Sequence, residues 1–146
     1  MPYEQLKLEN QVCFRLYTVA RLMTQAYQPW LSQLGITYTQ YIVLMVLWEQ
    51  DHQPVNDIAK RLYLETNTVT PLIKRMETLK IVTRRKDKED ARKTIVSLTK
   101  RGMAMEQEAA KIPACLTGIL CEKGLSVDDF VQIVPSLDRM IEQMAK

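Results

Sequence analysis

Most of the chain's cations lie in one stretch, where they could contact a polyanion. Residues 60–101 contain 13 Lys and Arg but 5 Asp and Glu, a balance of +8, while the rest of the chain has a balance of −5. A basic block between acidic flanks is expected where one part of a domain meets nucleic acid. An ordinary solvated surface could carry the same charges. The secondary structure that holds the cations must therefore distinguish a DNA-binding surface from a solvated one.

Residue types suited to metal or enzyme chemistry are scarce and isolated. His52 is the only histidine, and the spacing of Cys115 and Cys121 matches no common zinc motif. The sequence has no phosphate loop, dinucleotide fingerprint, G-x-S-x-G or H-E-x-x-H motif. Asp128 and Asp129 lie at an expected helix start, where the helix dipole explains paired carboxylates. We therefore expect no metal, no cofactor and no enzyme activity.

The composition is that of one soluble domain. The 146 residues are 47% hydrophobic and 25% charged, and 4 Gly are too few for a collagen-like or turn-dense all-β chain. No apolar run approaches the roughly 20 residues of a membrane helix, and the first residues lack signal-peptide features. Three Cys, an odd number, do not form a disulfide framework. We expect a single domain over residues 1–146, in the cytoplasm and away from membranes.

The hydrophobic pattern predicts a mainly α-helical fold. Helical spacing of apolar residues predicts one long amphipathic helix over 6–31, closed by Gly35. A nearly all-apolar stretch predicts a buried helix from Gln40 to about Asp51, capped by Thr37 or Thr39. Four more helices are expected over 54–63, 66–79, from 100 onward and over 126–145, with Thr66, Thr99 and a Ser126-x-x-Asp129 capping box at the last three starts.

A small β-hairpin is expected after the helix over 66–79. Residues 81–86 and 93–98 alternate as strands around a charged turn, Asp87 to Arg92. A short helix, a tight turn and a second helix with Thr and Asn at its start form a helix-turn-helix pattern. The hairpin that follows directly makes this a winged helix-turn-helix.

The start of the second helix of this pattern carries side chains that can read DNA. Short polar side chains at a helix N-terminus can approach a phosphate or a base edge closely. Asn67 can pair with adenine, and Thr68 or Thr70 can contact a thymine methyl group. Lys74 and Arg75 can reach phosphates or guanine, although alone they would fit a solvated face. The expected contacts on this helix are Thr66, Asn67, Thr68, Thr70, Pro71, Lys74 and Arg75.

The hairpin adds a second set of cations. An Arg92 inserted into the minor groove would be favoured by the negative potential of that groove. Asp90, two residues earlier, could hold the Arg92 guanidinium in place. The expected DNA contacts of the wing are Arg84, Arg85, Lys86, Asp90 and Arg92.

Cys13 lies among apolar residues of the first helix. A lone cysteine on an apolar helix is most often a small buried hydrophobe. A reactive cysteine needs a stabilised thiolate, which depends on neighbours in space. The residues alone leave both interpretations open.

Residues 55–102, with Asp90-x-Arg92 in the wing, resemble the DNA-binding core of the MarR family of transcriptional regulators. The resemblance extends over nearly the whole chain, and five segments resemble the organic hydroperoxide resistance (OhrR) branch of that family in particular: residues 8–17, 27–29, 34–41, 47–49 and 62–64. The resemblance implies a homodimeric winged-helix repressor that binds a palindromic double-stranded DNA operator. It also implies a DNA-binding part over about 38–100 and dimerisation helices over about 6–34 and 101–146.

In the OhrR branch the cysteine matching Cys13 senses organic hydroperoxides. The tyrosines matching Tyr27 and Tyr38 hydrogen-bond to it from the other subunit, where phenolic donors stabilise a thiolate. Without this role, both tyrosines would pack in the core. The oxidised thiol condenses with a low-molecular-weight thiol in some relatives and with a second cysteine in others. Cys121 lies nearer that second position than Cys115, and both would otherwise be buried residues without a redox role.

Two other functions fit the residues. One is a MarR-type repressor released by a small phenolic or apolar ligand, and the other is a peroxide-reducing enzyme that uses Cys13. Operator release by a phenolic ligand in Cys13→Ser would favour the first, and hydroperoxide turnover with excess thiol the second. Asn67 stands where relatives tend to have a small residue, so we expect a different operator preference.

Overall fold

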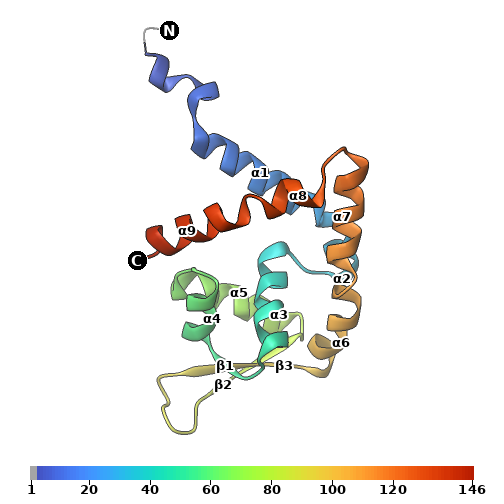
Figure 1. Ribbon diagram of the computed structural model, residues 1–146. Coiled ribbons are helices and arrows are strands. Elements are labelled where there is room, and N and C mark those ends of the chain that lie inside the picture. The colour runs from blue at the N-terminus through green and yellow to red at the C-terminus, as the bar shows by residue number, and fades with distance from the viewer. Residues whose placement is uncertain (1–2) are drawn as a thin grey trace. The chain divides into compact units, whose positions relative to one another are not determined.

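The computed structural model describes residues 3–146. The chain divides into two compact units, with the boundary along the sequence between Tyr38 and Thr39. Helices make up most of both units, and the second unit also contains a small antiparallel sheet (Figure 1). The predicted fold class, mainly helical with a β-hairpin wing, is confirmed.

The first unit contains two short 3-10 turns and two helices, so the single helix predicted over 6–31 is wrong. The elements are η1 (Glu4–Leu6), η2 (Leu8–Asn10), α1 (Val12–Ala26) and α2 (Gln28–Leu34). Gln11 is extended, and its side-chain amide donates to the carbonyl of Lys7 at 3.0 Å, which competes with helical hydrogen bonding. Pro29 lies in the first turn of α2, where its missing N–H is tolerated. Gly35 ends α2 at φ 72°, as predicted.

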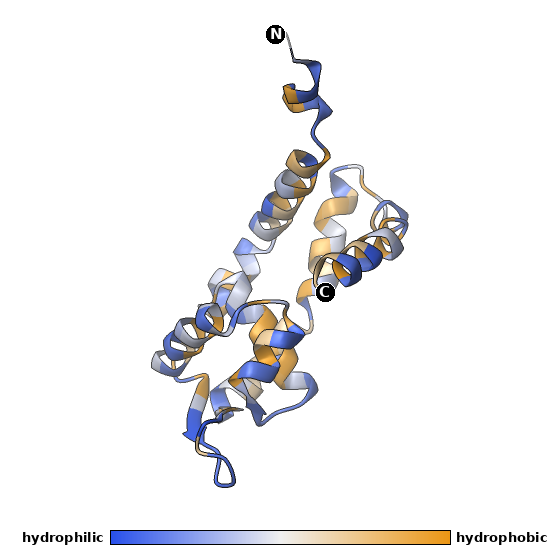
Figure 2. Ribbon diagram, turned by 90° about the vertical axis from the view of Figure 1, so that its left-hand side faces the viewer, coloured by the Kyte–Doolittle hydropathy of each residue, from blue (hydrophilic) through white to orange (hydrophobic). Residues whose placement is uncertain are grey.

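Helix α3 (Tyr38–Glu49) supplies much of the core of the second unit. It buries Tyr41, Val43, Leu44, Val46 and Leu47, as its continuous apolar run predicts. In Figure 2 apolar residues cover most of α3, whereas the loop between the two hairpin strands is hydrophilic. The helix begins two residues before the predicted start, directly after Thr37.

The winged helix-turn-helix follows α3. Its elements are β1 (Gln53–Pro54), α4 (Val55–Arg61), α5 (Thr66–Thr78), β2 (Val82–Lys86) and β3 (Thr94–Leu98), with strand order β1-β3-β2. The hairpin pairs Val82 with Leu98 and Lys86 with Thr94. Two-residue β1 was not predicted, because a strand this short leaves no alternating pattern. The apolar stripe of α5 is buried as predicted, at Val69, Leu72, Ile73 and Met76.

Two details of α5 differ from prediction. Its N-cap is Glu65, and Thr66 is the first helical residue, with its hydroxyl donating to Asn56 Oδ1 at 3.0 Å. Pro71 lies inside the helix, beyond the first turn, so the carbonyl of Asn67 loses its usual helical donor.

The last four helices are α6 (Lys100–Ala109), α7 (Ile112–Glu122), α8 (Val127–Val131) and α9 (Val134–Met144). The Thr99 hydroxyl accepts from the Gly102 N–H at 3.1 Å, which confirms the predicted cap. The capping box of Ser126 and Asp129 is also present. The helix predicted over 126–145 is split into α8 and α9, and Pro135 lies in the first turn of α9.

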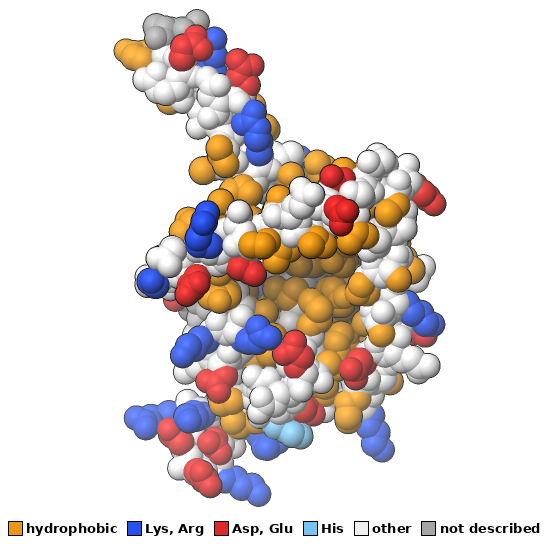
Figure 3. All heavy atoms as spheres, viewed as in Figure 1, with side chains coloured by type: hydrophobic (Ala, Val, Ile, Leu, Met, Phe, Trp, Pro, Cys, Tyr) orange, Lys and Arg blue, Asp and Glu red, His pale blue; other side chains and the backbone are white. Residues whose placement is uncertain are grey.

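Three helices leave their apolar side chains uncovered by this chain. Helices α1, α8 and α9 bury none of their described residues. Figure 3 shows apolar side chains gathered between α9, α3 and α7, and charged side chains around the hairpin loop. Among the residues described, no helix has the length and hydrophobicity needed to span a membrane.

Candidate functional site

The start of α5 presents polar side chains to solvent. Asn67 and Thr68 are exposed, so both can face a ligand as the sequence predicts. The hydroxyl of Thr70 donates to the carbonyl of Thr66 at 2.9 Å, inside the helix. The hydroxyls of Thr66 and Thr70 are thus engaged within the protein, whereas Asn67 and Thr68 are exposed. Pro71, Lys74 and Arg75 are exposed further along the helix.

Arg84 joins the wing to α5. Its Nε and Nη2 donate to Glu77 Oε1 at 3.2 Å and 3.0 Å. The Arg84 side chain is half-buried, so this ion pair fixes the angle between strand β2 and the helix. The sequence predicted Arg84 as a DNA contact, and the structure shows it paired with Glu77.

The tip of the wing holds the expected pair of Asp90 and Arg92. Arg92 Nε donates to Asp90 Oδ1 at 3.0 Å, Nη2 donates to Oδ2 at 3.3 Å, and the Arg92 backbone N–H also donates to Oδ1, at 3.1 Å. The hydrogen bonds from the Arg92 side chain and backbone hold the pKa of the Asp90 carboxyl below its usual value. The Arg92 side chain is nevertheless 91% exposed, so its guanidinium is oriented and still accessible.

A hollow of about 150 Å³ lies where the helix-turn-helix meets the wing. Its lining combines hydroxyl groups, one amide and three cations, and comprises Pro54, Val55, Asn56, Thr66, Thr70, Arg84, Arg92, Lys93 and Thr94. Hydroxyl, amide and guanidinium groups are the usual partners of DNA phosphates. Two of the predicted contacts of α5, Thr66 and Thr70, therefore lie beside two of the wing, Arg84 and Arg92.

Arg85 and Lys86 lie exposed on strand β2. Arg85 Nη1 donates to Ser97 Oγ at 3.3 Å, and Ser97 Oγ also lies 2.7 Å from His52 Nδ1. Asp51 Oδ1 accepts from the Leu98 backbone N–H at 2.8 Å, which ties the loop before β1 to strand β3. His52 therefore supports the sheet, and the described residues contain no group of three that could hold a metal.

Sequence reasoning missed three supporting residues: Asn56, Glu77 and Ser97. Each acts on a residue of another element, with sequence separations of 10, 7 and 12. Neither a local pattern nor a residue type marks such pairs in a single sequence.

The predicted redox residues lie in two places of the first unit. Cys13 is exposed near the start of α1, so the buried alternative is wrong within one protomer. The rings of Tyr27 and Tyr38 lie together, with centroids 5.1 Å apart. Tyr27 follows the last residue of α1, and fourteen residues of helix span about 21 Å. Cys13 therefore cannot hydrogen-bond to Tyr27 of its own chain.

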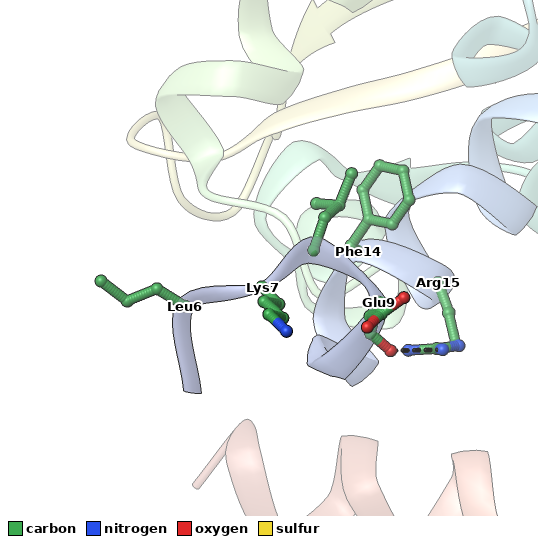
Figure 4. Close-up of a pocket in the computed structure, with 6 residues that line it drawn as sticks. Leu6, Lys7, Glu9, Phe14 and Arg15 are labelled. Carbon is green, nitrogen blue, oxygen red and sulfur yellow. Dashed lines mark hydrogen bonds between the residues drawn. The ribbon is translucent and has the colours of Figure 1, made fainter. Parts of the chain in front are cut away.

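Cys13 has apolar and open surroundings. Val12, Phe14 and Leu16 are all exposed beside it. A hollow of about 690 Å³ lies next to Phe14, lined by Leu6, Lys7, Leu8, Glu9, Phe14 and Arg15. Figure 4 shows Arg15 reaching back toward Glu9, whose carbonyl accepts from Nη2 at 2.6 Å. This hydrogen bond fixes the N-terminal segment against the start of α1.

The two remaining cysteines lie on α7. Cys115 and Cys121 are both exposed, so the alternative in which both are buried is wrong within one protomer. Six helical residues turn by about 240° and rise by about 9 Å, so the two thiols point in different directions. A single neighbouring thiol can therefore reach only one of them.

Comparison with known proteins places this geometry in a family. The chain matches the family model "Transcriptional regulator SarA/Rot" over residues 25–109. It is 38% identical to the organic hydroperoxide resistance transcriptional regulator of Bacillus subtilis (strain 168), over 97% of this chain and 95% of that protein. The chain belongs to the organic hydroperoxide resistance branch of the MarR family of transcriptional regulators. The resemblance stated from the sequence is confirmed.

Solved structures of AbfR, a protein of Staphylococcus epidermidis, share the fold of this MarR-family regulator. Reduced AbfR bound to DNA is 36% identical, with a TM-score of 0.78 over 100% of both chains. AbfR with a disulfide formed is 39% identical, with a TM-score of 0.66 over 95% of both chains. Among the structures of this relative are thus a reduced form on DNA and a disulfide form.

Proposed function

We propose that this MarR-family regulator is a homodimeric repressor that binds a palindromic operator and releases it when organic hydroperoxide oxidises Cys13. The observation that carries the proposal is the thiol of Cys13, exposed on an apolar helix in a chain that is similar over its length to an organic hydroperoxide resistance regulator. This role is that of a regulator, and we infer that the protein is not an enzyme and acts in the cytoplasm, where its operator lies.

DNA binding uses one surface of the second unit. Helix α5 enters the major groove, and the tip of the wing reaches the adjacent minor groove. In a dimer two such helices lie about 34 Å apart, the spacing of one turn of a palindrome. The proposed contacts are Thr66, Asn67, Thr68, Thr70, Pro71, Lys74, Arg75, Arg84, Arg85, Lys86 and Arg92, with Asp90 orienting Arg92.

Dimerisation covers the apolar surface that one chain leaves open. Val19 and Leu22 of α1 and Ile141 of α9 are about half exposed. Covering such side chains contributes about 25 cal/mol for each Å² of apolar surface removed from water. We propose that residues of about 6–34 and 101–146 form the dimer interface around a DNA-binding part of about 38–100, together one domain over 1–146.

The sensing step is a nucleophilic displacement on the peroxide bond. The Cys13 thiolate attacks one oxygen of the hydroperoxide, the O–O bond breaks, and the leaving alkoxide takes a proton to become an alcohol. Cys13 is left as a sulfenic acid. Tyr27 and Tyr38 of the partner subunit donate hydrogen bonds that stabilise the thiolate. The exposed apolar side chains beside Cys13 favour an organic hydroperoxide over hydrogen peroxide.

The sulfenic acid then condenses with a second thiol and releases water. The candidates are Cys121, Cys115 and a low-molecular-weight thiol. Because Cys115 and Cys121 point in different directions, Cys121→Ser and Cys115→Ser separate them. The variant that lacks the resolving thiol should lose the intersubunit disulfide that oxidised wild type shows on a non-reducing gel. Absence of that disulfide from oxidised wild type itself indicates a small-molecule thiol.

The proposal is tested by operator binding with and without an organic hydroperoxide. Wild type should release the DNA, whereas Cys13→Ser should bind normally and ignore the oxidant. Release that persists in Cys13→Ser would contradict the thiol mechanism and favour a repressor controlled by a bound phenolic or apolar ligand. Repeated turnover of hydroperoxide with excess thiol would instead indicate an enzyme.

A further inference from the structure

The turn between α4 and α5 holds a tyrosine where helices usually place a glycine. Tyr63 has φ 56° and is the second residue after the end of α4. Its N–H donates to the Lys60 carbonyl at 3.2 Å, and the Leu64 N–H donates to the Ala59 carbonyl at 3.0 Å. These two bonds define a Schellman turn, whose left-handed residue is most often glycine because a Cβ is strained there.

Helices α2, α5 and α7 end in the same turn, which is strained only where its left-handed residue is not a glycine. Gly35 after α2 and Gly124 after α7 have positive φ and the same pair of backbone hydrogen bonds. Lys80, after α5, is the second residue other than glycine that adopts this turn, at φ 62°. Lys80 is therefore a matched comparison for Tyr63, at the opposite end of the recognition helix.

Packing does not explain the tyrosine. Tyr63 is 67% exposed, so most of its ring contributes no burial to the fold. A bulky residue held at positive φ costs folding free energy, and such strain is typically kept at functional sites. The exposed phenol is therefore available for a contact outside the protomer.

The position of Tyr63 indicates what that contact is. Thr66, three residues later, begins α5, the helix that presents Asn67 and Thr68 to solvent. On the other side, Lys60 and Arg61 form the last basic turn of α4, and both are exposed. Tyr63 thus lies in the chain between two exposed cations, of which Arg61 also pairs with Glu49 (Nη2 to Oε2, 3.1 Å), and the N-terminus of the recognition helix. A DNA backbone would pass this turn when α5 enters a major groove. Tyrosine hydroxyls are common donors to phosphate oxygens.

We propose that Tyr63 donates its phenolic O–H to a backbone phosphate at the edge of the major groove that α5 enters. This inference rests on the proposed DNA-binding function. Because the donor is neutral, the contact releases no counterion and orients the helix without adding to the salt dependence of binding.

The test measures affinity and salt dependence for a palindromic duplex selected from random DNA by the wild-type protein. Tyr63→Phe should weaken binding roughly 10- to 100-fold, the scale of one hydrogen bond to a charged group, with an unchanged salt slope. The loss should be equal on a random-sequence duplex, since a phosphate carries no sequence information.

Two glycine variants separate the phenol from the backbone strain. Tyr63→Gly should weaken DNA binding at least as much as Tyr63→Phe, yet raise Tm by roughly 2–4 °C because the strain is relieved. Lys80→Gly should raise Tm similarly and bind the duplex with wild-type affinity.

The outcomes distinguish the Tyr63 contact from DNA binding itself. If wild type binds the duplex and Tyr63→Phe binds equally well, the phosphate contact is wrong while DNA binding stands. If only Tyr63→Gly loses affinity, the ring makes another kind of contact and the inference is also wrong. Failure of wild type to bind any duplex would overturn the proposed function itself.

Discussion

At the scale of single residues, the pair of Asp90 and Arg92 shows how an exposed cation can be both accessible and oriented. The Arg92 guanidinium keeps two hydrogen bonds to the carboxylate while most of its surface faces solvent. The sequence predicted this pair because two residues in one tight turn must lie close together. Contacts such as that between Arg84 and Glu77 could not be predicted, because they depend on how a strand packs against a helix.

Arg92→Ala should weaken operator binding by about 1–3 kcal/mol, because it removes a cation that reaches a groove of the DNA. It should also reduce the slope of log affinity against log salt by about one, since one fewer counterion is released. Titrations at several salt concentrations measure both effects. An unchanged affinity would contradict the proposed contact between Arg92 of the wing and the DNA.

Asp90→Asn should also weaken binding, although it removes a negative charge close to the DNA. The reason is that the variant no longer holds the Arg92 guanidinium with a charge-assisted hydrogen bond. In wild type, the pKa of Asp90 is lowered, so Asp90 stays ionised at every pH above the ordinary pKa of a carboxyl group. The pair with Arg92 is lost only as the pH falls through the lowered pKa. The contribution of Asp90 should therefore be constant between about pH 5 and 8. Tighter binding by Asp90→Asn would show that simple charge repulsion dominates.

At the scale of elements, the helices with long apolar patterns were predictable from the sequence, whereas the breaks within helices were only partly predictable. The continuous run of α3 and the stripe of α5 each identified a helix and its buried face. The break between η2 and α1 was missed, because side-chain amides of Gln11 and Asn10 bind backbone carbonyls in place of a helical turn. Strand β1 was missed because its pairing with β3 is a long-range contact.

The close approach of α6 to the residue before β2 requires a glycine. A Cβ on Gly102 would overlap the backbone oxygen of Ile81, so Gly102→Ala should lower the free energy of unfolding by about 1–3 kcal/mol. Gly118→Ala, on α7, is the control, because a Cβ there meets no atom within 4 Å and alanine favours the helix. Thermal unfolding of both variants measures the difference. Equal Tm values would contradict the packing described for Gly102.

At the scale of the whole molecule, the chain is half of a functional unit. The apolar faces of α1, α8 and α9 lack partners in one protomer, and Cys13 lies a helix length away from Tyr27. In the proposed dimer, a second copy covers those faces and brings a tyrosine pair to each cysteine. A dimer thus explains why thiols and apolar helix faces are exposed in a single chain. The C-terminal helices already suggested packing between subunits from their sequence, whereas the pairing of Cys13 with tyrosines of the other subunit came from the family resemblance.

The measurement that tests this account most directly is the rate of DNA release in mixed dimers. Cys13→Ser and Tyr27→Phe variants are denatured together and refolded, and hydroperoxide is then added to the DNA-bound dimers. In a mixed dimer the Cys13 of one subunit meets the intact tyrosines of the other, so one site is complete. The mixture should show a fast phase of release that neither variant shows alone. If the mixture responds only at the slow rate of Tyr27→Phe, the tyrosine and the cysteine act within one chain and the intersubunit site is contradicted.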